Sequence, residues 1–311
     1  MMQLYGAVAA VDAADRAGLL SALVGPPATA HALAEQLGLN PRATEQVLAI
    51  LVALGAARPN GDRFEATGEL QTFLAAEHRL DSRALFAHVP VWLATGAPVV
   101  TMQDAEERES AYRRVTPGLG RMFRARAQEL AAALPRSPRA ILDVGCGSGI
   151  WSLSVAARHA GARVTGLDLP AVLDGFREFA AELGIADRVD TIAGDVHEMQ
   201  LPAPGSFDLV IVANVLRIES PARARHIVER VSPLTGAHGA ILVVDALAGG
   251  TPERDLAREV YAMHLALRSR DGRVHTADAI RGWFREAGFS RVAAIEFDAP
   301  AVESAALLFT R

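Results

Sequence analysis

The first hundred residues alternate apolar positions at helical spacing with short turns. The pattern predicts helices over residues 4–23, 30–37 and 41–54. Thr29 is expected to cap the second helix, and Asn40-Pro41 to open the third. Asn60-Gly61 then indicates a β-hairpin within residues 58–64. Two helices followed by a hairpin predict an all-α winged-helix domain, which we place over residues 1–103.

The charge of this region argues against a role in binding DNA. Between residues 29 and 70, three arginines stand against five carboxylates. Residues 47–54 of the third predicted helix are all apolar, a surface suited to protein rather than to phosphate. We therefore expect a dimerisation domain, with residues 4–23 mostly buried in a homodimer and with no nucleic-acid partner.

An arginine- and glutamate-rich stretch follows, and we interpret residues 104–137 as linker helices with a solvated face. Two of its apolar members, Met122 and Phe123, are expected to turn toward a substrate pocket.

Short apolar strands alternate with helices from residue 138 to residue 311. Strands are predicted over residues 140–144, 163–168, 189–192, 207–213, 240–245, 291–297 and 305–309, and helices over 151–159, 173–183, 223–231 and 277–287. This alternation is typical of an α/β fold, a Rossmann-like, doubly wound and mostly parallel sheet. Ligands of such sheets bind beyond the carboxyl ends of the strands, so we expect the site there.

Acidic residues stand at three of these strand ends. Asp143 precedes a glycine turn that ends at Gly149, and its carboxylate would repel pyrophosphate but suit a cationic ligand. Asp168 ends the second strand, where a carboxylate can accept both hydroxyls of a ribose. Asp195 follows the third strand, where its side chain could accept a hydrogen bond from the edge of an adenine. The three acids predict a nucleoside site that avoids phosphate.

This pattern resembles the class I S-adenosylmethionine-dependent methyltransferases over residues 140–311. With the N-terminal half included, the whole chain resembles the caffeate-type small-molecule O-methyltransferases and their bacterial relatives. The segments that match are Asp168-Leu169-Pro170, Asn214-Val215-Leu216 and residues 272–276. The resemblance implies S-adenosylmethionine as cofactor, held by Asp143, Gly145, Cys146, Gly147, Gly149, Asp168, Leu169, Gly194, Asp195, Val196, Ala213 and Asn214.

The catalytic position departs from the family pattern. Members commonly have a histidine base two residues after the position of Val215, whereas this chain has Arg217. Arginine stays protonated, so Arg217 is expected either to hold a carboxylate or phenolate of the acceptor or to pair with Glu219. His264 is the best replacement base, on a helix that lines the acceptor pocket in the family together with Met263 and Leu267.

Other histidines are weaker candidates for the base, namely His197, His226 and His275. None of them forms a ligand pair with the spacing of a metal site, so no metal is expected.

Three functions remain open from the sequence. The leading one is methyl transfer to an oxygen of a small aromatic or polyketide-like secondary metabolite. The alternative keeps the cofactor but uses the sulfonium charge for decarboxylation, hydroxylation or pericyclic ring formation, as the missing base would allow. A DNA-binding regulator is the third and is disfavoured by the acidic N-terminal region.

Composition narrows the chemistry further. The 311 residues carry a net charge of −5, and all 31 basic side chains other than histidine are arginine. Without lysine, Schiff-base chemistry and a phosphate-loop lysine are excluded. The single cysteine, Cys146, excludes an internal disulfide. No secretory signal and no membrane-spanning run is apparent, so we expect a cytoplasmic protein without a membrane partner.

Overall fold

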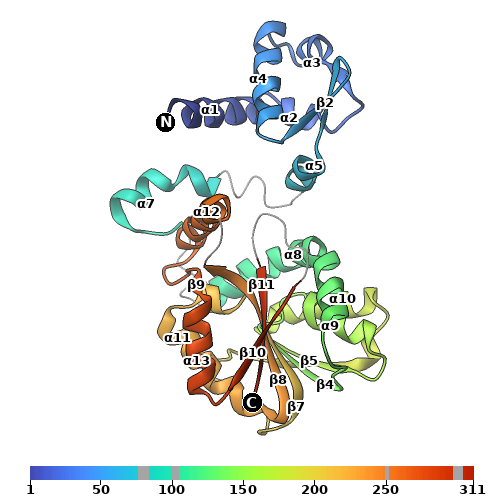
Figure 1. Cartoon of the computed structure of the whole chain (residues 1–311), viewed down its shortest axis with the longest axis vertical. Coiled ribbons are helices and arrows are strands. Elements are labelled where there is room, and N and C mark those ends of the chain that lie inside the picture. Colours follow the sequence, from blue (N-terminus) through green and yellow to red (C-terminus); the bar gives the residue numbers. More distant parts are fainter. Residues whose placement is uncertain (76–83, 100–104, 249–251, 297–303) are drawn as a thin grey trace. The chain divides into compact units, whose positions relative to one another are not determined.

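The computed structural model describes residues 1–75, 84–99, 105–248, 252–296 and 304–311 (Figure 1). The chain forms two compact units, Met1–Ser82 and Arg83–Arg311. The sequence predicted a boundary after residue 103 and a separate linker over 104–137. The predicted helical structure is found over most of that stretch, as α8 (Ala105–Ala133), but this helix belongs to the second unit, where it packs on α9 (Ile150–Arg158).

The first unit combines helices with a small antiparallel sheet. Its elements are α1 (Met2–Arg16), α2 (Leu19–Ala22), β1 (Ala28–Thr29), α3 (Ala30–Leu37), α4 (Pro41–Ala53), β2 (Ala57–Asn60), β3 (Arg63–Ala66) and α5 (Gly68–Ala75), with strand order β1-β3-β2. The single helix predicted over residues 4–23 is wrong, because Gly18 adopts a left-handed φ of 78° between α1 and α2.

The predicted caps and hairpin of this unit are confirmed. The Thr29 hydroxyl accepts a hydrogen bond from the Ala32 amide, and the Asn40 side chain accepts one from the Ala43 amide, both at 3.1 Å. Asn60 and Arg63 pair across the β2–β3 turn. The fully buried Leu48 and Leu51 of α4 belong to the core of the unit.

The second unit is built on a mixed sheet with strand order β10-β11-β8-β7-β4-β5-β6. The strands are β4 (Ala140–Val144), β5 (Arg163–Asp168), β6 (Val189–Ala193), β7 (Phe207–Ala213), β8 (Thr235–Ala248), β10 (Arg291–Ile295) and β11 (Ser304–Thr310), and a short β9 (His275–Thr276) pairs with β8. The pairs among β4, β5, β6, β7 and β8 are parallel, whereas β11 runs antiparallel to β8 and β10. The predicted mostly parallel α/β sheet is confirmed.

Helices cover both faces of the sheet (Figure 1). One face lies against α8, α9 and α10 (Leu173–Glu182), and the other against α11 (Pro221–Val231) and α13 (Ala277–Glu286). The remaining helices are α7 (Val89–Thr95), α12 (Pro252–Arg268) and the short 3-10 helices η1 (Pro170–Val172), η2 (Ala186–Arg188), η3 (Leu216–Ile218) and η4 (Ser232–Leu234). Among the described helices, none is both long and apolar enough to cross a bilayer.

The order of strands explains where the site forms. The chain adds β5 and β6 on one side of β4 and then returns to place β7 on the other side. The strand order therefore reverses between β4 and β7, and ligands of α/β sheets bind beyond the carboxyl ends of the strands at such a point.

Candidate functional site

The glycine turn after β4 is shaped by the protein's own packing. The amides of Gly145 and Cys146 both bond to the Leu167 carbonyl, at 2.8 and 3.1 Å. Gly145 and Gly149 have φ of 63° and 71°, in the left-handed region that glycine favours. A Cβ on Gly145 would lie 2.6 Å from the Val215 side chain, and one on Gly149 would clash with Phe176. The sequence predicted glycines that make room for a ligand, and these two are also required by side chains beneath the turn.

Asp143 faces the interior. It is 2% exposed, and its Oδ2 accepts a hydrogen bond of 2.5 Å from the Ser152 hydroxyl on α9. Burial raises its pKa to about 8, although the bond from Ser152 opposes this shift. The expected carboxylate facing a cationic ligand is therefore replaced by a neutral carboxyl that braces the glycine turn against α9.

Asp168 ends β5 with its carboxylate held by backbone groups. Oδ2 accepts a bond from the Gly147 amide and Oδ1 one from the Leu169 amide, each 2.7 Å long. Burial raises the pKa of Asp168 to about 6 against these two bonds, and the nearby Glu109 and Asp195 raise it further. Each oxygen keeps a lone pair that can accept a ligand hydroxyl.

Asp195 follows β6 and has partners on both oxygens. Oδ1 accepts a bond of 2.9 Å from the His197 amide, and Oδ2 one of 3.1 Å from Arg108 on α8. Burial raises its pKa, but the His197 amide and Arg108 outweigh burial and the net shift is downward. The amide of Gly194 also bonds to the Asp168 carbonyl at 2.9 Å, which ties the ends of β5 and β6 together.

Asn214 follows β7 with a φ of 61°, which a residue other than glycine rarely adopts. Its amide bonds to the Val244 carbonyl at 2.7 Å, next to Ala213, the buried last residue of β7. Its Oδ1 is buried and accepts no hydrogen bond from the residues that the structure describes. Buried polar atoms are normally bonded, so this oxygen is suited to a donor on a ligand.

These residues fit S-adenosylmethionine. Asp168, Asp195 and Asn214 lie at the ends of β5, β6 and β7, along one rim of the sheet beside β4. Carboxylate oxygens suit the ribose hydroxyls and the adenine amine, and the unpaired Asn214 oxygen suits an ammonium group. The remaining predicted cofactor residues, Leu169 and Val196, lie beside them and are partly buried.

Arg217 is buried in η3, after β7, and its ionic partner is Asp245 rather than Glu219, the partner in one of the two roles that the sequence left open. Its Nε lies 3.8 Å from Oδ1 of Asp245, and its amide donates to Asp245 Oδ2 at 3.1 Å. Its guanidinium carbon stands 5.2 Å from the centre of the Tyr261 ring. Burial raises the pKa of Asp245 to about 6, and the Arg217 charge opposes this shift.

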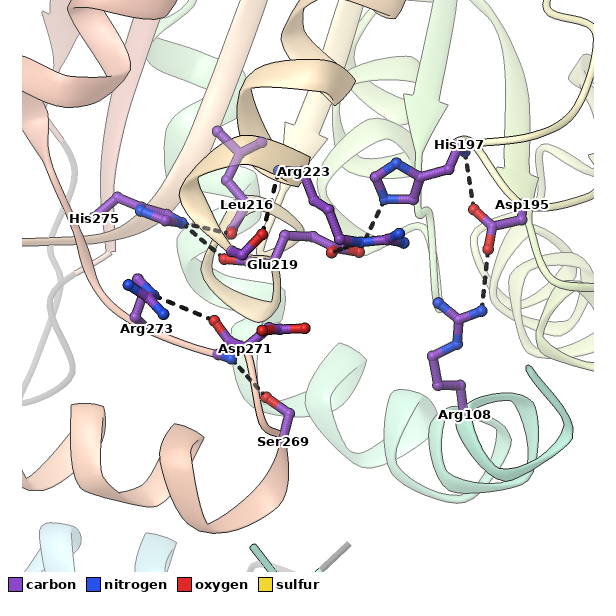
Figure 2. Close-up of polar contacts among 12 residues, drawn as sticks. Arg108, Asp195, His197, Leu216, Glu219, Arg223, Ser269, Asp271, Arg273 and His275 are labelled. Atoms are coloured by element: carbon purple, nitrogen blue, oxygen red, sulfur yellow. Dashed lines mark hydrogen bonds and ion pairs between the residues drawn. The ribbon is translucent and has the colours of Figure 1, made fainter. Parts of the chain in front are cut away.

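Glu219 is instead the centre of a polar network (Figure 2). Its Oε1 lies 3.1 Å from His197 Nε2, and its Oε2 accepts a bond of 2.6 Å from Arg223. Burial raises the pKa of Glu219, but its bonds to His197 and Arg223 give a net lowering. His275 Nε2 lies 2.9 Å from the Leu216 carbonyl and 3.2 Å from the Glu219 carbonyl, so His275 fixes the backbone of the loop after β7. His197 and His275 thus have structural partners, and among the described residues no cluster suits a metal ion.

Only some of the residues that the sequence predicts to contact the acceptor are placed where they could do so. His264 on α12 is partly buried, with its ring centre 5.8 Å from Tyr261 and 6.1 Å from Phe86. Phe123 contradicts the expectation of a pocket residue, because it is buried in the core against Trp151. Leu267 is also fully buried, and Met122 is 43% exposed. Met263 is partly buried on α12.

Sequence reasoning missed three residues of this site: Arg108, Asp245 and Tyr261. Asp245 ends the predicted fifth strand, so its position at the rim was a usable signal. Arg108 is on α8, where the high charge of the sequence favoured a solvated linker. Only its ion pair with Asp195, which lies 87 positions further along the chain, reveals it.

Comparison with known proteins agrees with this architecture. The family model for the O-methyltransferase domain matches residues 94–290, more than half of the chain. A 3-hydroxy-5-methyl-1-naphthoate 3-O-methyltransferase from Streptomyces sahachiroi is 26% identical, over 93% of this chain and 88% of that protein. A tetracenomycin polyketide synthesis 8-O-methyl transferase from Streptomyces glaucescens is 27% identical, over 94% of this chain and 90% of that protein.

Solved structures share the fold along the whole chain. Human N-acetylserotonin methyltransferase, solved in complex with S-adenosylmethionine, superposes with a TM-score of 0.69 at 19% identity. The similarity covers 98% of this chain and 94% of the human one. The chain therefore belongs to the O-methyltransferase family and is an S-adenosylmethionine-dependent enzyme that methylates a small molecule.

Proposed function

We propose that this enzyme methylates a hydroxyl group of an aromatic, naphthoate- or polyketide-like secondary metabolite, which reaches the site as an anion. The relatives named above act on a hydroxynaphthoate and in polyketide synthesis, which supports the substrate class. The observation that carries the proposal is Arg217, a buried cation at the position where the family has a base.

The cofactor supplies an electrophilic methyl group, and the protein supplies position. We assign Asp168 to the ribose of S-adenosylmethionine, Asp195 and Val196 to its adenine, and Asn214 with the glycine turn to its amino-acid group. The turn residues are Gly145, Cys146, Gly147 and Gly149, with Leu169, Gly194 and Ala213 completing the walls. Most of the rate then comes from holding donor and nucleophile together in a water-poor site.

Arg217 orients the acceptor oxygen rather than removing its proton. A guanidinium remains charged at any working pH, so it cannot accept a proton but can bond to a phenolate. Asp245 and the Tyr261 ring fix the guanidinium from two sides. Since a cation beside a phenol favours its ionised form, an acidic acceptor needs no separate base.

His264 is the proposed proton acceptor where the acceptor is an anion through another group, such as a carboxylate, and its reacting hydroxyl is still protonated. It stands one helical turn from Tyr261, whose ring faces the Arg217 guanidinium. Neutral imidazole can take up a proton near neutral pH. Met263 and Met122 are proposed to contribute apolar contacts to the acceptor.

The N-terminal unit is proposed to be a winged-helix dimerisation domain. Leu4, Val8 and Val11 share one face of α1 and are 59%, 65% and 37% exposed, whereas Ala10 and Ala14 on another face are buried. An apolar helical face of this kind is expected to bind a second copy of the chain. A cytoplasmic location and the absence of nucleic-acid and membrane partners remain predictions from the sequence.

Product analysis tests the proposed reaction. The enzyme is incubated with S-adenosylmethionine and 3-hydroxy-5-methyl-1-naphthoate, and we expect one S-adenosylhomocysteine for each methyl ether formed. Arg217→Met should lower kcat/KM about 10- to 100-fold, the value of a charge-assisted hydrogen bond, and Arg217→Lys should recover part of it.

The control for the arginine variants is Arg225→Met on α11, an exposed arginine that should leave turnover unchanged. Consumption of the naphthoate without S-adenosylhomocysteine would contradict methyl transfer. Full activity of Arg217→Met would contradict the role of the guanidinium.

A further inference from the structure

The loop after β6 contacts the loop after β7, although these two strands are not neighbours in the sheet. The strand order places β4 and β5 between them. At the usual spacing of neighbouring strands, β6 and β7 are about 14 Å apart. The loops meet through their side chains, since Nε2 of His197 lies 3.1 Å from Oε1 of Glu219 (Figure 2). This pair therefore joins two loops across the width of two strands.

His197 is tied to the residue that we assign to the adenine. Its amide donates a bond of 2.9 Å to Oδ1 of Asp195, and Oδ2 of the same carboxylate accepts a bond of 3.1 Å from Arg108. The amides of Glu198 and Met199 bond to the Asp195 carbonyl, at 3.1 and 3.0 Å. Asp195 thus sets the backbone of the turn from which the His197 side chain projects.

The imidazole of His197 is enclosed, and its direction is defined. Its side chain is 7% exposed, and that of Glu219 is 12% exposed. The ring stacks on the ring of His226 on α11, with centres 5.8 Å apart and planes 9° from parallel. The bonds to Glu219 lower its pKa, so its carboxylate is ionised and accepts the proton carried by Nε2. A hydrogen bond to an ionised group is about twice as strong as one between neutral groups.

Glu219 passes this restraint to the loop that carries Arg217. It stands two residues after Arg217, and its amide bonds to the Leu216 carbonyl at 3.1 Å. Its other oxygen accepts a bond of 2.6 Å from Arg223, which is four positions further along the same segment and 43% exposed. Within the part of the chain that the structure describes, His197 is therefore the partner that joins this carboxylate to a different loop.

We propose that the His197–Glu219 pair couples the cofactor site to the position of the acceptor. A cofactor bound at Asp195 orders the turn of His197, and the ordered imidazole then holds Glu219 and the loop of Arg217. His197 is thus a positioning residue, and its role rests on the cofactor site and on the role of Arg217 proposed above. Two sites are coupled in this way when one ligand orders a segment that the other ligand needs ordered. The acceptor position is then best formed once the cofactor has bound.

Hydrogen exchange of the full-length protein, followed by mass spectrometry, measures this coupling without an acceptor. The amides of residues 217–219 all donate hydrogen bonds, so their exchange reports the opening of the loop. Saturating S-adenosylhomocysteine should slow their exchange at least about fivefold in the wild type, the lower end of the usual coupling between sites. In His197→Leu the slowing should fall below about twofold. His197→Gln keeps an N–H donor and should recover part of it.

Arg223→Met is the matched control, because it removes the other partner of Glu219 and leaves the contact between the loops. Its slowing should stay within about twofold of the wild-type value, as expected for a partly exposed ion pair. Glu219→Leu breaks the same pair from the other loop and should behave as His197→Leu. Slower exchange of residues 194–196 in each variant shows that the cofactor site is still occupied.

The outcomes separate the coupling from the cofactor site. Wild-type slowing of residues 217–219 in a folded His197→Leu or Glu219→Leu protein would overturn the coupling. A loss in Arg223→Met as large as that in His197→Leu would also overturn it, as would a wild type that binds S-adenosylhomocysteine without slower exchange of this loop. A wild type that does not bind S-adenosylhomocysteine would refute the cofactor site, and the coupling with it.

Discussion

At the scale of single residues, the chemistry of the rim depends on how each carboxyl group is solvated. Asp143 and Asp168 lie at the ends of the neighbouring strands β4 and β5, yet one is neutral and structural and the other keeps open lone pairs. The difference arises because Asp143 is enclosed with Ser152, whereas Asp168 receives two backbone amides that stabilise its charge.

The pKa of Asp168 gives the first prediction. In the free protein its pKa is raised from 3.8 to about 6, so the carboxyl is partly protonated below that pH. Ligand hydroxyls bond best to the ionised form, and affinity for S-adenosylmethionine should therefore increase from about pH 5 to about pH 7 and then level off.

Calorimetry across this range checks the expectation. Asp168→Asn should bind weakly and lose the dependence on pH, while Asp190→Asn, whose side chain is exposed on β6, should behave as the wild type. The same raised pKa makes the free energy of unfolding decrease as the pH rises from about 4 to about 6. In this range the unfolded chain has already released the proton of this carboxyl, whereas the folded protein still holds it. An affinity that decreases toward neutral pH would contradict the assignment.

At the scale of elements, the loop between β7 and α11 controls the reacting position. It starts with the left-handed Asn214, continues through η3 with Arg217, and ends at Glu219. Two other segments hold its backbone. Asp245 of β8 accepts a bond from the Arg217 amide, and residues 273–275 donate from the Arg273 amide to the Arg217 carbonyl and from His275 to two further carbonyls. Its backbone is therefore fixed independently of the acceptor.

Removing the imidazole of His275 should loosen this loop. Burial lowers the pKa of His275, so the ring is neutral and its Nε2–H serves the carbonyls of Leu216 and Glu219. His275→Leu leaves both carbonyls without this donor and should cost about 1–3 kcal/mol of unfolding free energy. Because Arg217 lies within the loop, kcat should fall more than affinity for the cofactor.

Urea denaturation and steady-state kinetics measure the two effects. His275→Gln retains an N–H donor and should recover part of both losses. His238→Leu, at an exposed histidine, is the control and should change neither quantity. Unchanged turnover in a His275→Leu protein of lowered stability would show that the loop does not position Arg217.

At the scale of the whole molecule, the chain combines a catalytic unit with a unit whose exposed helix carries apolar side chains. The sheet, its covering helices and the whole polar rim belong to residues 83–311. The first unit has its own core around α4 and contributes none of the assigned cofactor residues. Its proposed role is to join two copies.

The oligomeric state is therefore the prediction at this scale. Light scattering should give a particle of twice the 32.9 kDa chain mass. A charge introduced into the apolar face of α1 by Val8→Asp should shift the population toward the monomer, because an unpaired carboxylate is costly to bury. Gln3→Glu, also exposed on α1, should remain dimeric. A wild-type particle of 32.9 kDa that persists at high concentration would contradict the proposal.

Most strands of the sheet were predictable because buried parallel strands appear in the sequence as short runs of apolar residues. Strands β4, β5 and β7 begin and end at the predicted residues. The wrong predictions of helix and domain boundaries have local causes. Gly18 divides the first predicted helix, and the many charged residues of α8 led to its interpretation as a solvated linker. Phe123 was misplaced because an apolar residue on a charged helix has no sequence signal for which face is buried.

The amino-acid sequence alone determined the family of this protein, since a glycine turn after a strand and acidic residues at successive strand ends are local features of the chain. Only the tertiary structure decided what those residues do. The protonation of Asp143 and the partners of Arg217 depend on burial and on charges contributed by segments distant in sequence. The local sequence pattern determines the backbone conformation. The solvation and electrostatic environment of each side chain depend on groups that come together only when the chain folds.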